Sequence, residues 1–245
     1  MLELYGRFIE RKYDIYQEKK CQVPVNNAVA IEQRECDLKI MKEDHQLLAL
    51  KVLFTEEQVA FLQNNSQCTF STEQLTRIGI VQVSHDGKTH FIHRTFAEYY
   101  VADCLVNRLT EGNNTSQPVE TFILKDIFLK RQYQVIRAFL DGLVSRSKIS
   151  KEILNRYRKA IHDLGKCAVL MLHRVAEEGN GNIVAIVLGS LQASEHTDTL
   201  HQLLLARDNS GKSAYFLAEE RGNIQVLEKL WDSAKNNLKK EKINT

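Results

Sequence analysis

The sequence predicts a mainly α-helical protein that contains one β-hairpin and ends in repeated helix pairs. Helix is favoured because only two prolines and 11 glycines interrupt 245 residues, and both residue types disrupt helices. The exception is 78–93, where β-branched residues flank Asp86-Gly87, a strong hairpin signal. The third observation is the similarity between 176–188 and 219–231, which indicates a repeated supersecondary unit.

Composition and charge exclude several classes of partner. The chain is 43% hydrophobic and 26% charged, as in ordinary globular proteins, and 33 basic against 31 acidic residues give a net charge of +2. This balance predicts no nucleic-acid partner. No apolar run approaches the ~20 residues that span a bilayer, so we expect no membrane partner. The cysteines are five, scattered and without metal-ligand spacing, which favours reduced thiols and a cytoplasmic location.

The first 64 residues predict helices separated by one loop. Residues 2–20 carry an aromatic stripe at helical spacing, typical of a face packed on the core. Its members are Tyr5, Phe8, Ile9, Tyr13 and Tyr16. Residues 21–36, around Pro24, are polar and irregular and favour a loop. Helical spacing returns over 37–64, with Thr55 as the cap of a second helix start.

The hairpin expected over 78–93 has a specific register. If Asp86 and Gly87 are the two turn residues, the facing pairs are Val83–His90, Val81–Ile92 and Ile80–His93. An isolated hairpin is marginal in water, so this one must pack on the flanking helices. Helices followed by a two-stranded wing are the layout of a winged-helix domain.

The segment after the hairpin predicts a capped helix. Thr95 and Glu98 form the Thr-x-x-Glu pattern of a capping box ahead of an apolar run. This start leaves His93 and Arg94 just outside a helix N-terminus, where free N–H groups and the macrodipole favour an anion. The alternative is that both are ordinary surface residues at a strand-to-helix junction.

Three domains follow from these patterns. The polar stretch 111–118 ends a winged-helix-like unit, 1–110. Residues 119–145 predict a helix pair with an apolar face, and 149–172 predict one or two more helices, so 111–168 is a helical domain. Residues 169–245 hold the repeat. The apolar residues of the helix pair are Phe122, Ile123, Ile127, Phe128, Val135, Ile136, Phe139 and Leu140.

The repeat has a period of 43 residues, measured from Gly179 to Gly222. Each glycine precedes an asparagine and suits an interhelical turn. The apolar positions that follow match in the same register and suit the inward face of a second helix. The matching pairs are Ile183–Val226, Val184–Leu227, Val187–Leu230 and Leu188–Trp231.

These units resemble the ankyrin repeat. Asp208, Gly211 and Ser213-Ala214 stand in the place of the D-x-x-G-x-T-P opening, and 172–176 is similar to its L-H-x-A-A portion. Ala214 replaces the usual Pro, Phe216 the usual His, and the period exceeds the usual 33. Two units are fewer than a free-standing array needs, so they must lean on the preceding helices. The resemblance implies a protein partner, with Arg207, Asp208, Asn209, Lys212 and Tyr215 as candidate contacts.

A second resemblance covers the stretch after the hairpin. FIHRTFAEYYVADCL is similar to the segment that ends the winged helix of NACHT-type NTPases, through Phe91, His93, Thr95, Phe96, Glu98, Tyr99 and Ala102. Residues 4–20 and 203–235 resemble the preceding helix and the long ankyrin units of arthropod NACHT proteins. The resemblance implies innate-immunity-like signalling and an ADP-phosphate contact by His93 in the resting state. The chain has no G-x-x-x-x-G-K-[ST] motif, so ADP or ATP requires an NTPase domain from elsewhere.

Three functions are therefore open. The first is a non-enzymatic protein-interaction and regulatory module, and the second is the regulatory half of a STAND-type NTPase that senses ADP through His93. The third is an enzyme built on histidines such as His85, His90 and His93. That group has strand spacing instead of helical metal-ligand spacing, and no nucleophile or metalloprotease motif accompanies it. We therefore expect no enzyme, no metal and no cofactor bound by this chain alone.

Overall fold

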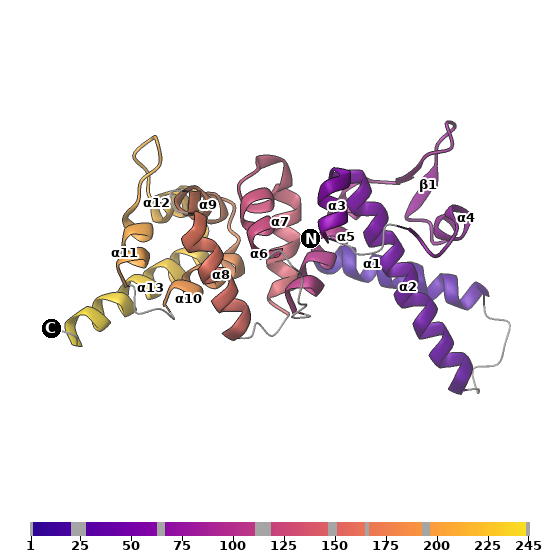
Figure 1. The fold of residues 1–245 in the computed structure, drawn as a ribbon, viewed down its shortest axis with the longest axis horizontal. Helices are drawn as coiled ribbons and strands as arrows, with labels where there is room; N and C mark the ends of the chain where they lie inside the picture. The colour runs from indigo at the N-terminus through magenta and orange to yellow at the C-terminus, as the bar shows by residue number, and fades with distance from the viewer. Residues whose placement is uncertain are drawn as a thin grey trace. The chain divides into compact units, whose positions relative to one another are not determined.

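The computed structural model describes residues 2–20, 28–62, 67–110, 119–146, 151–164, 167–192 and 197–243. Within these ranges the chain is mainly helical, with 13 α-helices and one small antiparallel sheet (Figure 1). It forms two compact units, unit 1 (Met1–Cys104) and unit 2 (Leu105–Thr245). None of the described helices is long and apolar enough to cross a membrane. The predicted mainly α class with one hairpin is confirmed.

Unit 1 is a set of helices with a hairpin between α4 and α5. Its elements are α1 (Leu2–Lys20), α2 (Ala28–Leu53), α3 (Glu56–Leu62), α4 (Thr72–Thr76), β1 (Val81–Val83), β2 (Thr89–Phe91) and α5 (Arg94–Thr110), which continues into unit 2. The predicted stripe of α1 faces the core only in part, because Phe8 is exposed and Tyr5 and Tyr16 are half-buried. Tyr13 is buried, and the rings of Tyr5 and Phe8 lie 5.3 and 5.4 Å from that of Phe96.

The loop predicted over 21–36 is wrong from Ala28 onward, because α2 begins there. The residues that follow, AVAIEQREC, contain good helix formers and no glycine or proline. Residues 21–27, which include Pro24, lie outside the described residues. The start of α3 is as predicted, since Thr55 Oγ1 accepts the Gln58 N–H and Gln58 Oε1 accepts the Thr55 N–H.

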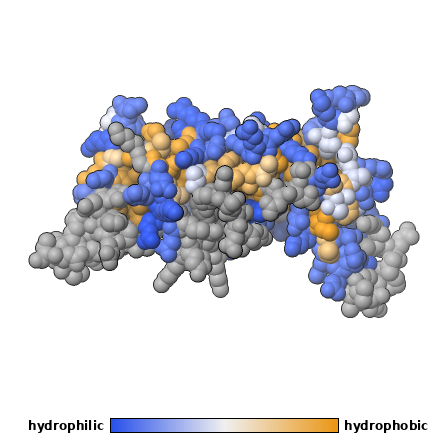
Figure 2. Space-filling view, in the orientation of Figure 1, coloured by the Kyte–Doolittle hydropathy of each residue, from blue (hydrophilic) through white to orange (hydrophobic). Residues whose placement is uncertain are grey.

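The hairpin forms, but its register differs by one residue from the predicted one. Val81 pairs with Phe91, and Ser84 N–H donates to Lys88 O at 2.9 Å, so the loop has three residues instead of two. A two-residue type I′ turn needs positive φ at both central positions, and Gly87 alone has it, at 79°. The loop tip is exposed and hydrophilic (Figure 2).

The helices of unit 2 pack in two rows. The described elements after α5 are α6 (Val119–Phe122), the π-helix η1 (Ile123–Phe128), the 3-10 helix η2 (Arg131–Tyr133), α7 (Gln134–Val144), α8 (Lys151–Leu164), α9 (Cys167–Glu177), α10 (Gly181–Gln192), α11 (Thr197–Leu205), α12 (Ala214–Glu220) and α13 (Ile224–Ile243). The apolar face predicted over 119–145 is buried at every position except Val135, which is half-buried.

The rows follow the order of the chain. In the first row α9 packs against η1 and also against α12, and in the second α10 packs against α7 and also against α13. The third helix recurs too, because α8 packs on α10 as α11 packs on α13. A shift of 43 residues moves 151–164 to 194–207, over α11. The structural period therefore starts with η1 and α7, one unit before the repeat that the sequence shows.

Candidate functional site

His93 lies at the start of α5 and caps it. The helix begins at Arg94, and His93 Nδ1 accepts the Thr95 N–H at 3.2 Å. The predicted capping box is therefore wrong: Thr95 lies inside the first turn, and the buried Glu98 accepts Arg94 Nε at 3.1 Å. A ring nitrogen replaces the hydroxyl oxygen as the acceptor that an N-cap supplies. The His93 side chain is otherwise exposed.

The five candidate partner contacts surround one tight loop between α11 and α12. Arg207 and Ser213 form an antiparallel bridge, and Asp208 N–H donates to Lys212 O at 2.8 Å. Asp208 Oδ1 accepts the N–H groups of Ser210 and Lys212, both at 2.9 Å. The Ser210 hydroxyl donates to Asp208 Oδ1 as well. This hydrogen bond first, and then those of the two N–H groups, lower the pKa of Asp208. Asp208 is thus the residue that holds the loop closed.

Two more of the five are held within the chain. Arg207 Nη1 donates to Gly211 O at 2.7 Å, and Lys212 Nζ reaches both carboxylate oxygens of Glu220 at 2.7 Å. Asn209 is exposed in the loop, and Tyr215 is exposed in the first turn of α12. The other three make hydrogen bonds or ion pairs within the chain, so Asn209 in the loop and Tyr215 on α12 are the stronger candidates for contact with a partner.

Successive units of the stack are tied by polar contacts. His173 Nε2 lies 3.0 Å from Lys212 O, and Asn223 Nδ2 donates to Ala176 O and Glu177 O at 2.9 Å. The asparagine of the second Gly-Asn therefore joins its turn to the unit before, whereas Asn180 of the first Gly-Asn donates to Glu178 Oε2 at 3.0 Å within its own unit. Between the unit of α7 and the unit of α9, Arg137 forms a bidentate ion pair with Glu178. These contacts join successive layers of unit 2.

A buried polar cluster in unit 1 was not predicted. Asp44, His45 and Gln46 are consecutive residues of α2 and all are buried. Asp44 accepts the Thr69 and Phe70 N–H groups at 3.0 and 2.7 Å. No pattern in the sequence marks it, because Asp44, His45 and Gln46 follow Lys42 and Glu43 in a polar run of the helix.

His45 and two tyrosines form the centre of this cluster. His45 Nδ1 lies 2.8 Å from Met41 O and 3.0 Å from Tyr13 Oη, which lies 2.9 Å from Tyr100 Oη. Because a carbonyl only accepts, Nδ1 carries the proton. His45 Nε2 is buried and makes no hydrogen bond to the described residues. Burial lowers the pKa of His45 from 6.5, against smaller opposing effects from the Met41 carbonyl, Asp44 and the Leu75 carbonyl.

The depressed pKa makes unit 1 acid-sensitive. The folded state binds fewer protons at His45 than the unfolded state does, so stability is full above pH 6.5 and falls as the pH drops below it. We expect the thermal unfolding midpoint to fall between pH 7.5 and 5, and to fall less in His45→Gln. His162→Gln is the control, because His162 is 78% exposed. Equal acid sensitivity of His45→Gln and the parent chain in circular dichroism melts would contradict this assignment.

Burial also raises the pKa of Asp103, whose carboxylate accepts Gln46 Nε2 at 2.8 Å. The buried cluster around His45 contains titratable groups, and none of the residues described in it is an exposed nucleophile. Among the residues that the structure describes, no group of three or more His, Cys, Asp or Glu side chains is placed to hold a metal ion. His85 and His90 lie on the hairpin, where His90 Nε2 contacts Gln82 Nε2 at 2.8 Å.

Comparison with known proteins gives no match for this chain among family descriptions, curated proteins or solved structures.

Proposed function

We propose that the chain is a non-enzymatic protein-interaction and regulatory module in which ankyrin-like repeats of unit 2 bind a protein partner. The observation that carries the proposal is the Arg207–Ser213 loop, which is closed by Asp208 and leaves Asn209 and Tyr215 exposed. Rigid loops lose little entropy on binding, and tyrosine supplies a large contact area with few rotatable bonds. The winged-helix-like unit 1 is the regulatory part, by its resemblance to NACHT proteins.

The stacked units support this function more than they support catalysis. Repeat proteins bury a continuous core between neighbouring units and use an extended outer surface for binding. In unit 2, η1, α9 and α12 follow one another in the row that leads to the loop. We therefore place the partner on the loop and the adjoining end of α12.

Tyr215→Ala tests the surface. An exposed tyrosine at the centre of an interface commonly contributes 2 kcal/mol or more, so partner affinity should fall by roughly 30-fold. Calorimetry on the captured partner gives the constants. Val52→Ala is the control, because Val52 is exposed on α2 in unit 1. Affinity that falls equally in both variants, or in neither, would remove the loop as the binding surface.

The alternative function is ADP sensing through His93 when a P-loop domain is supplied. One observation favours it: His93 Nδ1 accepts a hydrogen bond, which leaves Nε2–H as a donor on an exposed ring. A full-length protein with such a domain should release ADP faster when it carries His93→Ala than when it carries His85→Ala. Stopped-flow release of a fluorescent ADP measures the rate. Equal rates in the two variants would rule the sensing role out.

A further inference from the structure

The last unit of the stack exposes apolar side chains at positions that are buried in the unit before it. Tyr215, Phe216 and Trp231 are 42%, 44% and 63% exposed. We call these three residues the end face. Moving back by 43 residues gives Leu172, His173 and Leu188, which are 0%, 4% and 3% exposed.

The inward positions of the two units do not show this difference. Val175 and Ala218 are both fully buried, and so are the pairs Ile183–Val226 and Val187–Leu230. The units are thus equivalent on the side that faces the preceding layer. They differ on the other side, where α12 packs on α9, α13 packs on α10, and His173 contacts Lys212 O.

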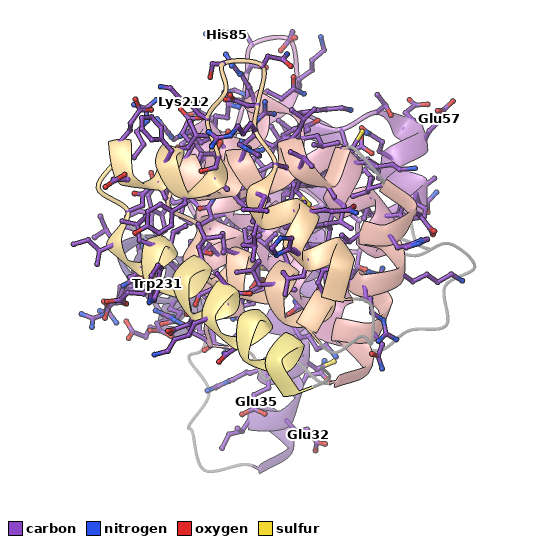
Figure 3. The ribbon with its side chains drawn as sticks, turned by 90° about the vertical axis from the view of Figure 1, so that its left-hand side faces the viewer. Glu32, Glu35, Glu57, His85, Lys212 and Trp231 are labelled. Atoms are coloured by element: carbon purple, nitrogen blue, oxygen red, sulfur yellow. The ribbon has the colours of Figure 1, made fainter. Side chains whose placement is uncertain are left out.

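Figure 3 looks onto α11, α12 and α13, with Trp231 at the outer edge of the helices and Lys212 near the loop. Apolar side chains of this size are costly to leave in water, at about 25 cal/mol per Å² of exposed apolar area. Two of these exposed residues lie on α12 and one on α13, which pack together, and large apolar side chains exposed on adjoining helices are a feature of interaction surfaces.

We propose that the end face docks a helical hairpin of the same kind as α12–α13, supplied by a protein partner. This inference rests on the proposed interaction function and adds the shape of the partner to it. The end face continues, by one period, the interface that α9 and α10 make with α12 and α13. A hairpin placed there meets Tyr215, Phe216 and Trp231 as the present last unit meets Leu172, His173 and Leu188.

Charge at the rim specifies the partner further. Between the existing units, Arg221 in the turn after α12 pairs with Glu177 at 2.6 Å. The residue one period after Glu177 is Glu220, which is exposed and is reached by Lys212 Nζ at 2.7 Å. The docked hairpin therefore carries an aliphatic inner face and an arginine or lysine in its turn, facing Glu220.

Insertion of one more period into the full chain tests the proposal. A copy of 193–235 is placed between Lys235 and Asn236, in register because 193 plus 43 is 236, and its tryptophan is changed to phenylalanine. Trp231, the single tryptophan of the chain, then reports on the end face. We expect its emission to shift to shorter wavelength and its quenching by acrylamide to fall. A matched insertion with aspartate at the copied Ala218 and Val226 should leave Trp231 as accessible as in the parent chain.

Two results would overturn the proposal. Trp231 emission could stay unchanged while circular dichroism shows added helix, so that the new hairpin folds without docking. Alternatively, the insertion could add no helix, so that the end face does not support a hairpin. Crosslinking of the partner from position 209, measured on the chain without the insertion, separates failure of this inference from failure of the proposed function.

Discussion

Arg137→Met should destabilise unit 2 by about 3–5 kcal/mol, because it leaves one partner of a buried ion pair alone. The Arg137 side chain is fully buried. Its Nε and Nη2 donate to Glu178 at 2.6 and 2.5 Å. Its Nη1 donates to Ile127 O at 2.5 Å and to Lys130 O at 2.7 Å. One side chain thus joins η1, the residue before η2, and the turn that follows α9. Chemical denaturation followed by circular dichroism measures the loss.

Two comparisons make this prediction specific. Arg221→Met breaks the exposed pair with Glu177, and exposed pairs contribute only about 0–1 kcal/mol. The double variant Arg137→Met/Glu178→Met removes both buried charges and should recover much of the loss, since paired apolar replacements are often neutral. A loss at Arg137 no larger than at Arg221 would show that the pair does not hold the first two layers together.

Asp141→Ala should cost about 3 kcal/mol for a different reason. Asp141 lies near the end of α7, and its Oδ1 accepts the N–H groups of Asn182 and Ile183 at 2.7 and 2.8 Å. Asn182 Nδ2 donates to its Oδ2 at 3.0 Å. These N–H groups lie in the first turn of α10, where no partner exists within the helix. Removing the carboxylate leaves them unsatisfied and removes a favourable charge from a helix N-terminus.

The control for Asp141 is Asp163→Ala, which should change the free energy of unfolding by less than about 0.5 kcal/mol. Asp163 is 62% exposed near the end of α8. Burial raises the pKa of Asp141, with its hydrogen bonds acting in the opposite direction. Urea titrations of the two variants at pH 7 give the comparison. Equal losses would mean that α7 and α10 are joined by apolar packing alone.

Local patterns in the sequence predicted the local structure of this chain well. Helical spacing located α1 and the apolar helices of unit 2, and Thr55 with Gln58 marked the start of α3. The hairpin was located correctly, but its register depends on backbone angles at Asp86 that residue type does not fix. The start of α5 was misplaced because a histidine cap competes with the Thr-x-x-Glu pattern.

Long-range contacts were the part that sequence patterns did not reveal. His45 meets Tyr13 and Tyr100 from helices far apart in the chain, and no spacing rule joins them. The unit formed by η1 and α7 was not predicted from the sequence as part of the repeat, because these two helices match the later units in their packing and not in their residue types. Several conclusions from the sequence stay predictions. They are the winged-helix and ankyrin identities, the domain limits 1–110, 111–168 and 169–245, the cytoplasmic location, and the absence of nucleic-acid and membrane partners.

The most direct test of the interaction function is photo-crosslinking from the loop. A photoreactive amino acid replaces Asn209 in one variant and Val52 in another, and each is expressed in cells that contain the natural partners. We predict that the Asn209 variant gives a discrete crosslinked protein, that Tyr215→Ala abolishes it, and that the Val52 variant does not give it. The same crosslinks from both positions, or none from Asn209, would contradict the central claim that the repeat loop of unit 2 is a binding surface.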